Sequence, residues 1–102
     1  MEAATTTERL WFANAPDQFC WGVWPDEEEA VLFHQGSGDT LMLNPLGEFL
    51  LKRLQIEQQT QSELAASAAT YFDISNDNEL AGAVYLSLLT FRSLGLVISD
   101  SL

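Results

Sequence analysis

Residues 31–46, VLFHQGSGDTLMLNPL, restrict the chain to folds in which a tight β-hairpin runs directly into a helix. The stretch begins with strand formers, and residues 36–39 (GSGD) have the glycine content of a turn. Residues 40–43 follow as a second short strand. Asn44 is then a suitable helix N-cap, and Pro45 takes the first helical position, where a proline has no hydrogen bond to lose. The stretch therefore predicts an α+β fold.

The residues before this hairpin predict further strands. Side chains alternate along residues 19–24, so that Phe19 and Trp21 face one way and Cys20 the other. With residues 30–34 and 40–43 they predict a three-stranded antiparallel meander, which becomes four-stranded if residues 10–14 join its sheet. The sequence leaves that membership open. Cys20 itself is expected to be a small buried or half-buried side chain.

Three helices are predicted after the meander. Apolar residues at positions 46, 49, 50 and 54 form one face of a helix over residues 45–55, which a polar break at 55–59 follows. Thr60 and Glu63 fit a capping box, which predicts a second helix over residues 60–72. A third helix over residues 78–94 closes at Gly95, a suitable left-handed C-cap. The apolar residues 96–98 either pair with the sheet or cover the core.

Length and charge limit the kinds of partner. With 102 residues the chain is long enough for one core, so we expect a flexible N-terminus at residues 1–9 and a single domain over 10–102. The net charge is −11, from 15 acidic against 4 basic residues. Nucleic acids and anionic membranes both need clustered cations, so neither is expected as a partner. A basic or mostly apolar partner suits this chain better.

No residue pattern predicts catalysis, a metal or a cofactor. Cys20 is the only cysteine and His34 the only histidine, which excludes a disulfide within the chain and a Cys/His metal cage. The glycines of residues 36–40 lie between strands with no lysine near, unlike a phosphate-binding loop. Residues 73–84 place Asn78 and Val84 where a calcium loop needs glycine and glutamate. Residues 1–10 do not resemble a signal peptide, so the expected location is the cytoplasm.

The third predicted helix is apolar around most of its circumference. One stripe contains the apolar residues 80, 84, 88 and 91, a second contains 81, 85 and 89, and Leu86 adds apolar surface on another side. Such a helix is either buried in the core or offers surface to a peptide or to a second copy of the chain. A homodimer is therefore one of the possible assemblies.

The predicted element order and several short motifs resemble a known family. Three strands followed by three helices is the order of a small winged-helix domain. The motifs are residues 31–34 (VLFH), 36–40 (GSGDT), 43–46 (LNPL), Leu50 and Leu54, the helix start at 60–64, and 94–97 (LGLV). Over about residues 20–98 the chain resembles PqqD-like peptide chaperones, also called RiPP recognition elements. It is most similar to the branch associated with HPr-kinase-related proteins.

This resemblance implies peptide binding without catalysis. Related domains hold the leader of a ribosomally made precursor peptide as an added strand beside the third strand of the sheet, against the third helix. They present the precursor to a modifying enzyme, which here implies a peptide-modifying or HPr-kinase-related partner. Combined with periodicity, the resemblance predicts these peptide-binding residues: Thr40, Leu41, Met42, Leu43 and Asn44 from the strand, and Ala81, Tyr85, Leu88 and Leu89 from the helix. Strand alternation turns Met42 away from Leu41 and Leu43.

Another class of function fits the same predicted fold. A winged-helix scaffold or regulatory protein would act through protein contacts, or through DNA if it carried a basic recognition helix. Arg92 is the only cation of the predicted third helix, and the second helix has none. Protein contacts are therefore favoured over DNA in this alternative.

Overall fold

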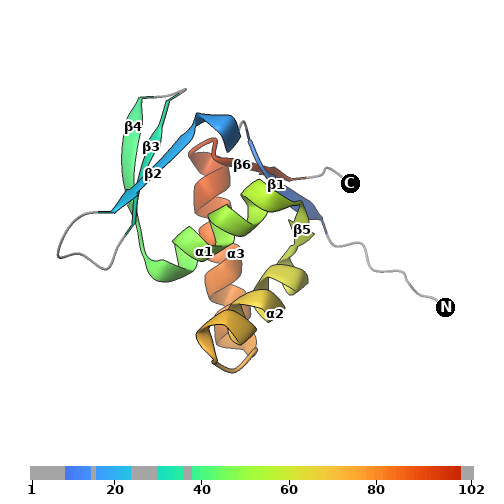
Figure 1. Cartoon of the computed structure of the whole chain (residues 1–102). Helices are drawn as coiled ribbons and strands as arrows, with labels where there is room; N and C mark the ends of the chain where they lie inside the picture. The colour runs from blue at the N-terminus through green and yellow to red at the C-terminus, as the bar shows by residue number, and fades with distance from the viewer. Residues whose placement is uncertain (1–8, 15, 24–29, 36–37, 100–102) are drawn as a thin grey trace.

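The computed structural model describes residues 9–14, 16–23, 30–35 and 38–99. It shows an α+β fold with two small antiparallel sheets and three α-helices, which confirms the predicted class (Figure 1). The strands are β1 (Leu10–Ala13), β2 (Phe19–Val23), β3 (Ala30–His34), β4 (Asp39–Leu43), β5 (Gln59–Thr60) and β6 (Val97–Ser99). The helices are α1 (Pro45–Ile56), α2 (Gln61–Phe72) and α3 (Asn78–Ser93), with a short 3-10 turn, η2 (Pro16–Gln18). The predicted flexible segment, residues 1–9, lies outside the described residues except for Arg9.

The predicted meander forms the first sheet, in the order β2-β3-β4. Its register pairs Leu32 with Trp21 on one side and with Leu41 on the other. Alternate residues of β3 face the core, and Leu32 is fully buried. The indole Nε1 of Trp21 donates to the side-chain oxygen of Gln55 at 2.7 Å, which attaches the sheet to α1. The predicted turn at residues 36–39 lies partly outside the described residues.

Residues 10–13 form a strand, but it does not extend the meander. β1 pairs with β5 on one side and β6 on the other, in a second sheet of order β5-β1-β6. A four-stranded meander is therefore wrong, and residues 97–99 pair with β1 rather than with the meander. β1 instead pairs with two strands from later in the chain: after α3 the chain turns at Gly95, whose φ is +80°, and β6 then runs antiparallel to β1.

The helix boundaries follow the predicted caps closely. The Asn44 side chain accepts from the backbone N–H of Gly47 at 2.8 Å, and Thr60 with Glu63 forms the predicted capping box of α2. Asp77 caps α3. The polar break at 55–59 is partly wrong, because α1 continues to Ile56 and Gln59 belongs to β5. Pairing with β1 leaves Gln59 only 7% exposed.

Cys20 is exposed, so the expectation of a buried or half-buried thiol is wrong. Its neighbours in β2 explain this, since Phe19 and Trp21 face the core and strand alternation turns Cys20 to the opposite face. On that face its sulfur accepts a hydrogen bond from the Gln35 amide nitrogen at 3.1 Å.

The buried side chains form one contiguous core to which all three helices contribute. Figure 1 shows α1 crossing the middle of the molecule with α3 behind it and α2 below. The largest fully buried side chains of the core include Leu50, Leu64, Val84 and Leu88. α3 therefore supplies both the centre of the core and, on its other sides, exposed surface.

Removal of the α2 cap provides a test of this local account. We expect Thr60→Ala to lower the free energy of unfolding by about 1 kcal/mol, because the backbone N–H of Glu63 then loses its acceptor at 3.1 Å. Urea unfolding followed by circular dichroism measures the change. Thr70→Ala, at an exposed position of the same helix, is the control and should change stability by less than about 0.5 kcal/mol. Equal losses in the two variants would contradict the capping role.

Candidate functional site

The outer edge of β4 is open. β4 pairs with β3 and with no other strand among the described residues. In an antiparallel edge strand, every second residue directs its N–H and C=O away from the sheet, where a further strand can bind them. Leu41 is half-buried and Leu43 buried on the core side, whereas Thr40 and Met42 are exposed. This alternation agrees with the opposite directions predicted for Met42 and its two neighbours.

A hollow of about 250 Å³ lies between the end of β4 and α3. We call it the β4–α3 groove, and it is lined by Met42, Leu43, Asn44, Gly47, Leu86, Ser87, Thr90 and Phe91. Leu43 and Phe91 are buried at the groove. Met42, from β4 on one side of the groove, is 52% exposed, and Leu86, from α3 on the other side, is 64% exposed. Among the described residues that line this groove, none carries a charge. The groove therefore suits an apolar side chain better than an ionic one.

Gly47 allows α1 to begin beside the groove. A Cβ at this position would lie 3.2 Å from Oδ1 of Asn44 and 3.3 Å from Cζ of Phe91, closer than most side-chain contacts. The absence of a side chain thus lets the Asn44 cap and the Phe91 ring approach the same turn of helix. This packing holds the end of β4 in place against α3.

The structure brings only part of the predicted peptide-binding set to this groove. From the strand, Met42, Leu43 and Asn44 line it, whereas Thr40 and Leu41 do not. From the helix, none of the four predicted residues does: Leu88 is fully buried, and Leu89 is half-buried against the core. Tyr85 lies in a different hollow with Arg9, Trp11 and Gln61, and the Ala81 carbonyl accepts from the Gln61 side chain at 3.1 Å.

Helix geometry explains the difference. Successive residues of an α-helix are about 100° apart, so Tyr85 and Leu86 point to different sides of α3. The stripe with Tyr85 faces the β1 side, and the stripe with Leu86 and Thr90 faces β4. On α3, the sequence signals for the groove were Phe91, at the end of the first predicted stripe, and Leu86, an apolar residue outside both stripes.

The described residues show neither a metal cluster nor a membrane-spanning helix. Within them, no group of three or more His, Cys, Asp or Glu side chains is placed to hold a metal ion. No helix in this part of the chain combines the length and apolar character needed to cross a membrane. In comparisons with protein-family models, curated proteins and solved structures, the chain has no match in any of the three.

Proposed function

We propose that the chain is a non-catalytic peptide-binding chaperone that captures the leader of a ribosomally synthesised precursor peptide by β-strand addition. The observation that carries this proposal is the open edge of β4 beside an uncharged groove with exposed Met42 and Leu86. The resemblance of residues 20–98 to PqqD-like peptide chaperones names the class of ligand. It also names the recipient, a peptide-modifying or HPr-kinase-related enzyme.

Strand addition divides recognition between backbone and side chains. The backbone of β4 supplies hydrogen bonds that tolerate any leader sequence, each contributing about 0.5–1.5 kcal/mol net. Every second side chain of the added strand points toward one face, where Met42 and Leu86 offer apolar contact. Burying one such side chain fully contributes about 1.5–3 kcal/mol to the free energy of binding. The protein should therefore prefer leaders that place an apolar residue against Met42 and Leu86.

The charge of the chain adds a preference that the groove itself lacks. With a net charge of −11, the protein attracts basic peptides and repels acidic ones at long range. This effect acts on the rate of encounter and weakens as salt is added. The preferred leader is therefore apolar at alternate positions and basic or neutral elsewhere.

A titration followed by NMR tests the proposal. The probe is a synthetic ten-residue peptide that alternates leucine and lysine, added to ¹⁵N-labelled protein. We expect amide shifts concentrated at residues 39–44 and 86–91, with slower hydrogen exchange along β4. The control peptide has the same side chains but is methylated at alternate backbone nitrogens, so that one of its edges cannot donate, and it should bind at least about tenfold more weakly.

Two outcomes would count against this proposal. Shifts confined to other faces of the molecule would place the peptide elsewhere. Equal binding of the methylated peptide would indicate attraction by charge alone. Sedimentation of the protein at several concentrations separates a third case, in which a second copy of the chain already occupies the β4 edge and gives protected amides without any peptide.

A further inference from the structure

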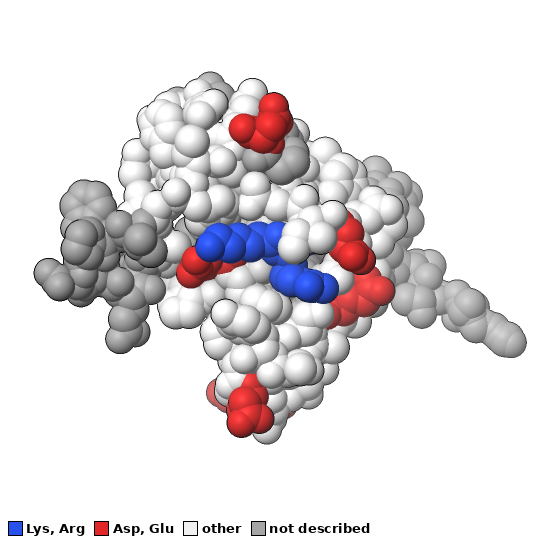
Figure 2. Space-filling view, in the orientation of Figure 1, with Lys and Arg blue, Asp and Glu red and all other residues white. Residues whose placement is uncertain are grey.

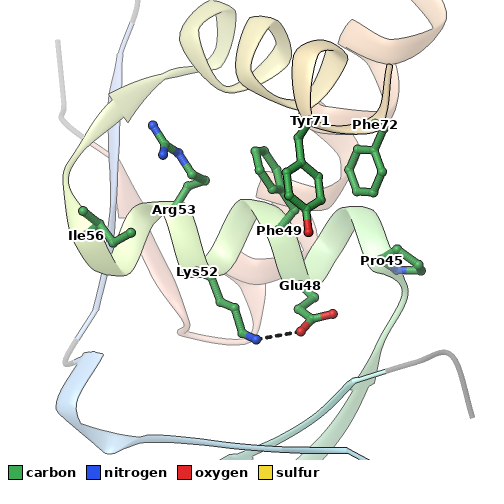
Figure 3. Close-up of a pocket in the computed structure, with 8 residues that line it drawn as sticks. All are labelled: Pro45, Glu48, Phe49, Lys52, Arg53, Ile56, Tyr71 and Phe72. Carbon is green, nitrogen blue, oxygen red and sulfur yellow. Dashed lines mark hydrogen bonds and ion pairs between the residues drawn. The ribbon is translucent and has the colours of Figure 1, made fainter. Parts of the chain in front are cut away.

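A second groove lies on the face of α1 that points away from the β4–α3 groove. It runs between α1 and α2, encloses about 300 Å³ and is lined in part by Phe49, Lys52, Arg53, Ile56, Tyr71 and Phe72 (Figure 3). A neighbouring hollow of about 440 Å³ shares Phe49, Arg53 and Tyr71 and continues along α2 to Thr70. We call the two together the α1–α2 groove. Their shared walls make it elongated, with Arg53 and two rings at its centre.

Three aromatic rings form one wall of this groove. Phe49 and Tyr71 are stacked with ring centroids 4.7 Å apart, and Phe72 meets both rings edge-on at 5.6 and 4.9 Å. Tyr71 is nevertheless 69% exposed, and Ile56 at the other end is 72% exposed. Rings held by one another present apolar surface with little side-chain entropy to lose on binding. The wall thus suits a planar apolar group.

The two cations of the groove differ in their partners. Lys52 forms an ion pair with Glu48 at 2.7 Å and lies 4.8 Å from the centre of the Trp21 ring. Arg53 has no carboxylate partner among the described residues, and its buried Nε has no hydrogen-bond acceptor there. Figure 3 shows the two side chains leaving α1 in different directions, Lys52 toward Glu48 and Arg53 toward α2. The Nε itself is shielded from solvent, but Arg53 as a whole is only half-buried and borders both hollows, so its unpaired charge can meet an anion that enters the groove.

The surrounding charges make this cation unusual. The chain has only four Lys and Arg residues against fifteen acids, yet two of the four lie in this groove. Figure 2 shows basic side chains across the middle of this face, with acidic side chains close beside them. Because Glu48 neutralises Lys52, the net local charge comes from Arg53. At contact distance the groove therefore offers one positive charge beside aromatic rings, and this local attraction acts against the long-range repulsion of acidic segments by the net charge of −11, which salt screens.

We propose that the α1–α2 groove is a second docking site, which takes an acidic and aromatic peptide segment of a partner protein. One ring of the segment packs on Phe49 and Tyr71, and a carboxylate one or two residues away pairs with the Arg53 guanidinium. The elongated shape favours an extended segment over a single compact molecule, since Arg53 and the rings border both hollows. This site does not rest on leader binding at β4.

The location of the α1–α2 groove on α1 allows this groove and the β4 edge to be occupied at the same time. Glu48, Lys52 and Ile56 follow each other at i, i+4 spacing on the face of α1 that carries this groove. Gly47, which borders the β4–α3 groove, lies on the opposite face of the same helix. A peptide at β4 and an acidic segment at α2 would therefore not collide.

Fluorescence anisotropy with a labelled synthetic peptide tests this proposal. The probe is an acetylated, amidated hexapeptide, Asp-Phe-Glu-Leu-Asp-Gly, used with the intact chain at physiological salt. We expect Arg53→Gln to weaken its binding by about tenfold, because a charge-assisted hydrogen bond is lost. Arg92→Gln removes the same charge at an exposed position of α3 outside this groove and is the matched control, with an expected change below about twofold. A probe with Asn and Gln in place of its acids should lose about as much as Arg53→Gln.

Other outcomes would overturn the proposal. Equal losses in the two variants would show general charge attraction, and no binding by the unchanged protein would remove the site. Binding of N-acetylphenylalanine as tight as that of the peptide would indicate a small-molecule pocket instead. Tyr71→Ala is a second variant, at a largely exposed ring. If it does not weaken binding of the peptide, the proposed packing of a peptide ring on Tyr71 is wrong. Saturating the β4 edge with the leucine–lysine peptide should leave this affinity unchanged, which separates the two proposals.

Discussion

Leu86→Asn is expected to weaken binding of the leucine–lysine peptide by about tenfold or more, which corresponds to about 1.4 kcal/mol or more. Leu86 is 64% exposed in the free protein, so the variant should fold normally. When a peptide covers the groove, the leucine contributes apolar burial, whereas an asparagine amide must lose water without a new partner. The variant therefore affects the complex rather than the free chain. Isothermal titration calorimetry measures the change in affinity.

Tyr85→Asn is the matched control for this prediction. It changes the neighbouring residue, which is also exposed at 43%, to the same amide on the same helix. Because Tyr85 lies beside Arg9 and Trp11 instead of β4, its replacement should change affinity by less than about twofold. The opposite result, with Tyr85 critical and Leu86 silent, would place the peptide on the side of α3 that sequence periodicity first indicated.

Leu88→Ala is expected to lower the free energy of unfolding by about 2–5 kcal/mol. Leu88 is fully buried in the core, so the shorter side chain leaves a cavity in addition to losing its own burial. A domain of this size has a total stability of about 5–15 kcal/mol, and the loss would be a large part of it. Urea unfolding followed by tryptophan fluorescence measures the loss.

Leu86→Ala provides the comparison within the same helix. Both variants replace leucine by alanine two residues apart in α3, but Leu86 is largely exposed, so its replacement should cost about 0.5 kcal/mol or less. A similar loss of stability at both positions would contradict the orientation of α3 in which Leu88 faces the core and Leu86 faces solvent. A peptide-binding defect in Leu88→Ala at low temperature, where the fold persists, would likewise show that this residue contacts the ligand directly.

The helices were predictable because their signals are local. A capping box or an Asn-Pro pair satisfies the free N–H groups of the first turn with residues only a few positions away. Thr60 and Glu63 thus fix the start of α2 whatever packs around it. Gly95 marks the end of α3 by another local device, since its left-handed backbone lets the N–H of Leu96 donate to the carbonyl of Phe91 in the last turn. The strands of the meander were also predictable, since short turns pair neighbours in sequence.

Long-range pairings were not predictable from such signals. β1 joins β5 and β6, which lie about half the chain and nearly the whole chain away, and each offers only a short apolar or polar segment. Gln59 is the clearest case, because a polar residue in a polar segment becomes nearly buried only through pairing with Trp11. Its burial depends on a strand that no local pattern connects to it.

The sequence by itself determined the α+β class, the helix boundaries and an edge strand that leads directly into a helix, because each follows from hydrogen bonds between near neighbours. Only the tertiary structure decided which side of α3 faces that edge. Periodicity shows that two stripes are apolar, but the rotation of the helix depends on which residues the other elements bury. Packing buries Leu88 in the core and leaves Leu86 exposed at the β4–α3 groove. It also leaves the α1–α2 groove, with Arg53, open on the opposite face of α1.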